Sequence, residues 1–158
     1  MGILSWAANL GTNYVRINLT TGSGLNEKVP YRSGLNWGQR QGRDFNQAYL
    51  PIKYSDQSRG FFPDIGVNFQ VECDDGVILT LVRAQQNGKA LHTPERNSLL
   101  GEYFRKRLGV RSGDPVALRH LVEYGRTSVD IFRSQDNFFR LDFRTLIFTA
   151  SRDGSIDS

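Results

Sequence analysis

Long hydrogen-bonding side chains are concentrated in two short, glycine-containing stretches of the sequence, residues 36–46 and residues 83–89. An amide side chain presents a donor and an acceptor together, which matches adenine N6 and N7, and a guanidinium fork matches guanine N7 and O6. Each such pair is worth about 1–3 kcal/mol of discrimination between bases. The candidates for reading bases are Asn36, Gln39, Arg40, Arg43, Asp44 and Asn46 in the first stretch and Arg83, Gln85, Gln86, Asn87 and Lys89 in the second.

The same side chains are compatible with other roles. On flexible backbone they could cover a core edge, or bind a sugar or a phosphate. The run QQNG between two apolar segments is also typical of a plain hairpin tip. That interpretation is weaker for the two stretches together, because each combines amides with cations and each adjoins an expected strand. We expect Trp37 to anchor the first stretch rather than to pack on a sugar.

The positive charge of the chain is segregated. The net charge is +4, and sixteen arginines stand against four lysines. Residues 28–53 carry five cations against one carboxylate, and residues 83–111 carry seven against two, so these windows hold +9 and the remaining residues −5. Arginine suits phosphate and guanine, and such clustering indicates a nucleic-acid footprint. The candidates for phosphate contacts are Lys28, Arg32, Lys53, Arg96, Asn97, Ser98, Arg105 and Lys106.

Signals for catalysis are weak. The two histidines, His92 and His120, form no metal-ligand spacing, and the sequence holds no P-loop, GxGxxG or GxSxG. The nearest approach to a metal-dependent nuclease is Asp64 followed by Glu72, but Asp74 occupies the position of the required lysine. We therefore expect no catalytic residue, metal site or cofactor in this chain. A small Mg²⁺-dependent nuclease using Asp64 and Glu72, and a carbohydrate-binding β module, remain the alternatives.

Two features bear on the environment of the protein. Cys73 is the only cysteine, so no intrachain disulfide is possible, which fits a reducing cytoplasm. No stretch approaches the roughly 18–20 apolar residues of a membrane span. We expect a cytoplasmic protein with no membrane contact.

The elements that must position the polar stretches are mostly strands. Alternating or β-branched runs predict strands over residues 14–19, 48–53, 66–72, 77–83, 127–132, 138–143 and 145–150, with Asp75-Gly76 as a two-residue hairpin turn. Apolar residues at helical spacing predict helices over residues 98–108 and 115–124, ending at Gly109 and Gly125. This pattern favours a mainly β, barrel-like fold with short α-helices. We expect an entry or linker segment at 1–28, one domain at 29–150 and a polar tail at 151–158.

Several longer motifs resemble one family. They are SGLNWGQR with RDFNQAYLPI, then FFP, the DDG turn, QQNGKALHTPERNSLLGEYFRKRLGV, LVEYGRTSV and FFRLDF. Together they resemble the B3-like DNA-recognition domain of type II restriction endonucleases, the NgoFVII/NgoAVII group, with more distant kinship to BfiI and to plant B3 domains. The resemblance covers roughly residues 29–143.

The resemblance implies a seven-stranded open pseudobarrel that grips the major groove of double-stranded DNA with two arms. By order along the chain, residues 36–46 match the N-arm and residues 83–89 the C-arm. It also implies a non-catalytic specificity domain of a bacterial restriction–modification enzyme, whose cleavage centre lies in a separate nuclease domain.

Overall fold

The computed structural model describes residues 13–134 and 138–145. Their seven strands form one sheet in the order β1-β6-β7-β3-β4-β5-β2. The strands are β1 (Tyr14–Asn18), β2 (Leu50–Pro51), β3 (Phe69–Cys73), β4 (Ile78–Ala84), β5 (Ala90–His92), β6 (Ser128–Arg133) and β7 (Phe139–Asp142).

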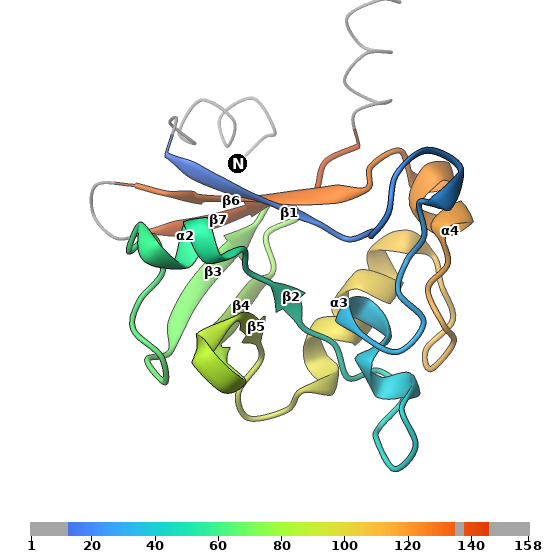
Figure 1. Cartoon of the computed structure of the whole chain (residues 1–158), viewed down its shortest axis with the longest axis horizontal. Coiled ribbons are helices and arrows are strands. Elements are labelled where there is room, and N and C mark those ends of the chain that lie inside the picture. Colours follow the sequence, from blue (N-terminus) through green and yellow to red (C-terminus); the bar gives the residue numbers. More distant parts are fainter. Residues whose placement is uncertain (1–12, 135–137, 146–158) are drawn as a thin grey trace, which may run out of the picture.

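The sheet is rolled into an open barrel (Figure 1). Neighbouring strands pair antiparallel except β3 and β7, which run parallel. The end strands β1 and β2 each pair with one neighbour only, β6 and β5 respectively, within the described residues. The expected mainly β, seven-stranded open pseudobarrel is confirmed.

The barrel interior is filled by the alternate residues of each strand. In β1 the pattern of exposed and buried residues alternates strictly, with Val15 and Ile17 inside. An aromatic cluster of Phe61, Phe62 and Phe139 packs with ring centroids 4.8–6.5 Å apart. Burying such side chains contributes about 1.5–3 kcal/mol each, which makes this cluster a main source of stability.

Short helices close the barrel and carry its loops. They are the α-helices α2 (Tyr54–Ser58), α3 (Ser98–Leu108) and α4 (Leu118–Tyr124), with 3-10 turns η1 (Gly24–Asn26), η2 (Gly34–Gln39) and η3 (Gln86–Gly88). α3 has the predicted bounds and ends at Gly109, whose φ of 71° is left-handed. α4 likewise ends at Gly125, with φ 106°. No helix of the described ranges is long and apolar enough to cross a membrane.

The DDG segment does form a hairpin between β3 and β4, but its turn is longer than predicted. The Gly76 N–H donates to the Cys73 carbonyl at 2.9 Å, and the Cys73 N–H donates to the Val77 carbonyl at 2.8 Å. Gly76, with φ 88°, supplies the left-handed residue that such a bulged turn needs. Cys73 itself is fully buried.

Other sequence expectations differ from the structure. β5 and α2 were not predicted, and residues 115–117 precede α4 rather than belong to it. β1 pairs with β6 over five residues, so the first strand of the barrel lies inside the segment expected to be a linker. The strand expected at 145–150, apart from Thr145, and the tail at 151–158 lie outside the described residues.

Candidate nucleic-acid interface

The two polar stretches project from neighbouring strands. Residues 36–46, here called the N-arm, run into β2, and residues 83–89, here called the C-arm, join β4 to β5. β2 and β5 pair directly, and the Ile52 N–H donates to the carbonyl of Lys89 at 2.9 Å. Both arms lie on the lower side of the molecule in Figure 1, away from β1 and β6. The fold therefore brings together two segments that are about forty residues apart in the chain.

The root of the N-arm is held by Asn36. This side chain is only 1% exposed. Its Nδ2 donates to the carbonyls of Pro30 at 2.9 Å and Val116 at 2.8 Å, and its Oδ1 accepts from the Val116 N–H at 2.8 Å. Because the amide is buried and bonded within the fold, it does not present its edge to a base, and we reassign Asn36 from base reading to fixing the arm.

Arg105, a residue of α3, also bonds the start of the N-arm. It is 1% exposed, and its guanidinium donates to the carbonyls of Asp114 at 2.8 Å, Gly101 at 3.3 Å and Leu35 at 3.3 Å. Burial lowers the pKa of Arg105, with an opposing effect from the charge of Asp114. The expected phosphate contact is corrected here as well, since the guanidinium is enclosed by protein carbonyls.

The far end of the N-arm is tied to the segment between α3 and α4. Asn46, 8% exposed, donates to Ser112 Oγ at 2.9 Å and accepts from the Gly113 N–H at 2.7 Å. Its amide is thus also used inside the protein, and we reassign it from base reading. The arm approaches α3 so closely that a Cβ on Gly101 would lie 1.8 Å from the Asn46 carbonyl oxygen.

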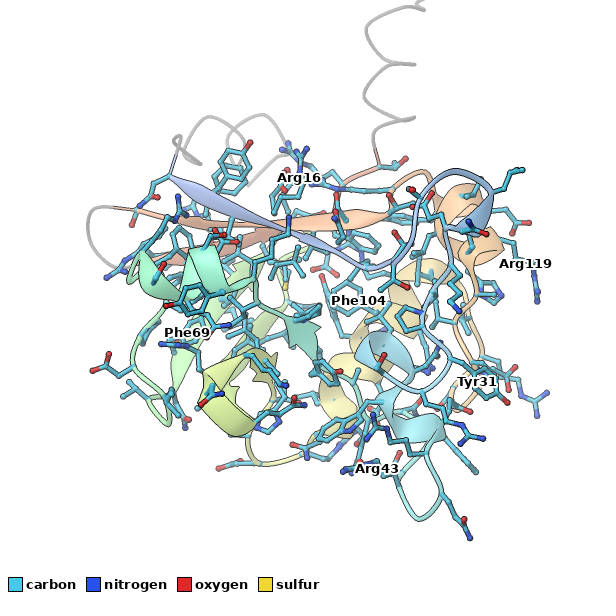
Figure 2. The ribbon with its side chains drawn as sticks, viewed as in Figure 1. Arg16, Tyr31, Arg43, Phe69, Phe104 and Arg119 are labelled. Carbon is cyan, nitrogen blue, oxygen red and sulfur yellow. The ribbon has the colours of Figure 1, made fainter. Side chains whose placement is uncertain are left out.

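Arg43 is the N-arm side chain best placed to reach a ligand. It is exposed, and its guanidinium lies 4.0 Å from the centroid of the Trp37 ring while donating to Gln47 Oε1 at 3.0 Å. Trp37 is 9% exposed and packs edge-on against Tyr49 with centroids 5.4 Å apart. The expected anchoring role of Trp37 is confirmed, and its ring also orients Arg43 at the lower edge of the molecule (Figure 2).

The other N-arm candidates, Arg40, Gln39 and Asp44, are only partly used in hydrogen bonds within the protein. Arg40 is exposed and donates from Nε to the Arg32 carbonyl at 2.9 Å, which leaves its other two guanidinium nitrogens without a hydrogen bond to the described residues. The Gln39 amide donates to the Phe45 carbonyl at 2.9 Å. Asp44 accepts from the backbone of the arm at 3.0 Å, so one of its oxygens is used in a turn. All three remain candidates for base contacts.

The C-arm has an unusual backbone. Gln85 has φ 66° and ψ 173°, and Asn87 has φ 66° and ψ 16°, so two residues with side chains adopt positive φ. Positive φ costs a non-glycine residue about 1–3 kcal/mol, and such strain concentrates at ligand-binding sites. Lys89 is exposed, whereas Arg83 folds back to the carbonyls of Gly88 at 3.3 Å and Pro63 at 3.4 Å. The side chain of Gln86 lies outside the described set.

The phosphate candidates fall into two groups. Lys28, Arg32, Lys53 and Lys106 are exposed. At the start of α3, Arg96 pairs with Glu102 and donates to Ser98 Oγ at 3.2 Å, and Ser98 is 6% exposed. Asn97, half-buried at the N-cap position, makes no side-chain capping bond. The first group is therefore more available to an external phosphate than the second.

Some cations of the described residues form an ion pair with a carboxylate and others do not. Arg16 in β1 pairs with Asp130 at 2.8 Å, and Arg126, just before β6, pairs with Asp130 at 2.9 Å and with Asp142 at 3.3 Å. Across the described ranges, the cations that pair with no described carboxylate are Lys28, Arg32, Arg40, Arg43, Lys53, Arg83, Lys89, Arg105, Lys106, Arg111 and Arg119. Every cation of both arms is in this group, so the arms carry positive charge that the fold leaves uncompensated.

The nuclease alternative gains no support from the geometry. Glu72 pairs with Arg140 at 3.5 Å, and Asp74 pairs with Arg107 at 2.8 Å and accepts from the Phe143 N–H at 2.7 Å. Among the residues that the structure describes, no three His, Cys, Asp or Glu side chains are grouped to hold a metal ion.

Both histidines make contacts within the fold, His120 through a hydrogen bond and His92 through ring stacking. His120 Nδ1 accepts from the Ala117 N–H at 2.8 Å at the start of α4. The His92 ring stacks on Trp37 with centroids 6.4 Å apart, and its Nδ1 is buried with no hydrogen-bond partner. Burial lowers the pKa of His92, so the ring is neutral at physiological pH.

The fold and the site together define a DNA-binding pseudobarrel with two cation-bearing arms on one side. The family described as the NgoFVII C-terminal B3-like DNA-binding domain matches residues 10–135. This match spans most of the chain, and the protein belongs to that family of DNA-binding domains. No curated protein matches the chain.

Two features of the site were not found in the sequence. Gln47, which holds Arg43, follows the predicted stretch by one residue, and its spacing of four from Arg43 was the available signal. The 111–114 turn, which meets the N-arm through Asn46, carries only an ordinary glycine turn signal. Its partner is 66 residues away in the chain, so only the fold brings the two together.

Proposed function

We propose that the protein recognises a short, specific sequence in double-stranded DNA by placing its N-arm and C-arm in the major groove. The observation that carries the proposal is the contrast in ion pairing. Arg16 in β1 and Arg126 just before β6 are held by carboxylates, whereas Arg40, Arg43 and Lys89 in the arms are exposed and pair with no carboxylate of the described residues. Membership of a DNA-binding family supports the same ligand.

The N-arm suits base reading because it is held in place by hydrogen bonds to the rest of the fold. Asn36, Arg105 and Asn46 bond the N-arm to the body of the barrel through several segments. Arg43 is oriented by a ring on one side and an amide on the other. A guanidinium fixed in this way loses little conformational entropy on meeting guanine, so more of the interaction free energy appears as specificity.

Lys28, Arg32, Lys53 and Lys106 are proposed to contact phosphates around the arms. Such contacts add affinity for all sequences and set the register of the arms, but they do not distinguish bases. Affinity should accordingly fall steeply as salt rises, with a log–log slope of about 0.9 for each phosphate neutralised.

Cleavage is proposed to reside in a separate nuclease domain of the full enzyme. Of the residues in the nuclease-like pattern, Glu72 pairs with Arg140, and Asp74, at the position of the required lysine, pairs with Arg107. The isolated chain should leave supercoiled plasmid intact in the presence of Mg²⁺. Cutting that is abolished by Glu72→Ala would overturn this part of the proposal.

Selection of bound sites from a random duplex library tests base recognition directly. We expect one short motif to be enriched at both low and moderate salt. Arg43→Ala should weaken the preference at one position, while Arg119→Ala, which removes an exposed and unpaired arginine on α4, should leave the motif unchanged. Binding without any enriched motif would refute sequence-specific recognition.

A further inference from the structure

The turn at residues 111–114, between α3 and α4, lies against the N-arm. The Asp114 N–H donates to the Arg111 carbonyl at 3.0 Å, and Gly113 takes φ 86° to close the turn. Asn46 holds it at Ser112 Oγ and at the Gly113 N–H, and the Gln39 amide donates to the Gly113 carbonyl at 3.4 Å. In Figure 1 the segment between α3 and α4 reaches down beside η2, toward the side on which the arms lie.

The position of this turn is fixed from within the protein as well. The buried Arg105 donates to the Asp114 carbonyl at 2.8 Å. Hydrogen bonds from Asn46 and Gln39 therefore join the turn to the N-arm, and the bond from Arg105 joins it to α3.

Arg111 and Ser112 are exposed on the turn. Arg111 forms no ion pair with any carboxylate of the described residues. Ser112 Oγ accepts from Asn46, which leaves its own hydrogen free to be donated. Beside it is a cleft of about 250 Å³, lined by Arg105, Lys106, Ser112, Glu102 and Val110.

We propose that the 111–114 turn is a phosphate-binding element of the DNA interface, with Arg111 as its charged contact and the Ser112 hydroxyl as a neutral donor. The proposal rests on the proposed function, because the turn meets DNA only if the N-arm does. Its ligand is a backbone phosphate on the flank of the bases that the N-arm reads. This phosphate contact sets the register of the N-arm on the DNA and carries no base specificity.

Arg111→Gln tests the proposal, with Arg119→Gln as the matched control. Both changes remove one exposed, unpaired arginine, but Arg119 lies on α4 at the right edge of the view, well above Arg43 of the N-arm (Figure 2). Affinities of the full chain for the selected duplex and for a scrambled duplex are measured by fluorescence anisotropy at salt concentrations from about 50 mM to about 300 mM. Thermal unfolding of each variant confirms that both remain folded.

Arg111→Gln should weaken both duplexes alike, by about tenfold, the loss expected for one charge-assisted hydrogen bond. It should also make the log–log salt slope shallower by about one. Arg119→Gln should change neither quantity.

Three other outcomes would count against the account in different ways. Equal behaviour of the two variants overturns the phosphate element and leaves the proposed function standing. A loss confined to the selected duplex overturns it too, because that result indicates a base contact. Failure of the unaltered chain to bind any duplex refutes the proposed function itself.

Discussion

In Gly101→Ala, helix propensity and packing should change the free energy of unfolding in opposite directions. The sign of the net change therefore tests how the N-arm is held against α3. Gly101 lies in the interior of α3, where alanine is favoured over glycine by about 1 kcal/mol. A Cβ at this position, however, would lie 1.8 Å from the carbonyl oxygen of Asn46 and 2.9 Å from a guanidinium nitrogen of Arg105. Helix propensity alone predicts a more stable protein, and the packing predicts a less stable one.

The packing effect should be the larger. Relief of a 1.8 Å contact with backbone requires the arm to move by roughly 1.5 Å, since ordinary contacts lie at 3.4 Å or more. That movement breaks the bonds from Asn46 to Ser112 at 2.9 Å and to Gly113 at 2.7 Å. At about 1 kcal/mol for each bond and about 1–3 kcal/mol for the strain, less the helix gain of about 1 kcal/mol, we expect a net destabilisation of about 2–4 kcal/mol.

Urea unfolding followed by circular dichroism measures this difference, and anisotropy with the selected duplex measures its effect on binding. Lys106→Ala, at an exposed position of the same helix, is the control and should alter the free energy of unfolding by less than about 0.5 kcal/mol. A Gly101→Ala protein that is more stable than the parent by about 1 kcal/mol and binds DNA equally well would refute the proposed docking of the arm.

Three further changes probe the arms. Asn36→Ala removes the three short hydrogen bonds of this side chain to Pro30 and Val116 and should lower the free energy of unfolding by about 3 kcal/mol, whereas the exposed Asn68→Ala should be nearly neutral in the same urea titration. Gln85→Gly relieves a backbone strain of about 1–3 kcal/mol, so thermal unfolding should shift upward while specific DNA binding weakens; a downward shift would contradict the strained conformation. Because the pKa of His92 is lowered in the fold, the unfolded chain takes up the proton first as pH falls below about 6.5, and stability should decline there. His92→Gln should flatten this decline between pH 7.5 and pH 5 in unfolding titrations, and an unchanged pH dependence would exclude His92 as its source.

The sequence predicted the barrel well because its strands carry their own signal. Alternation in β1 and the β-branched run of β4 identify strands without knowledge of their partners. The glycine after α3 likewise marks its end. β5 was missed because three residues after a polar turn are too few to show a period, although pairing with both β2 and β4 places it inside the sheet.

The sequence predicted the kinds of side chain in the arms but not their division of labour. Asn36, Asn46 and Arg105 have the same chemistry as the exposed candidates, yet they fix the arm from inside. Their partners, such as Val116 and Ser112, lie 66–80 residues away. Burial of a polar side chain depends on those distant partners. Residue type and spacing alone therefore cannot distinguish a side chain that contacts bases from one that holds the arm in place.

We propose that exposed, preoriented side chains read the bases, and Arg43 is the clearest example. Neither its ring contact nor its bond to Gln47 shields it from solvent, so it is poised for a ligand that accepts a planar fork. Arg43 is therefore the side chain whose removal should change sequence preference most.

The most direct test is selection from a random duplex library, carried out in parallel with the unaltered chain, Arg43→Ala and Arg119→Ala. We expect one enriched motif for the unaltered chain, the same motif for Arg119→Ala, and loss of preference at one position for Arg43→Ala. No enriched motif for the unaltered chain, or an unchanged motif for Arg43→Ala, would contradict base reading by the N-arm.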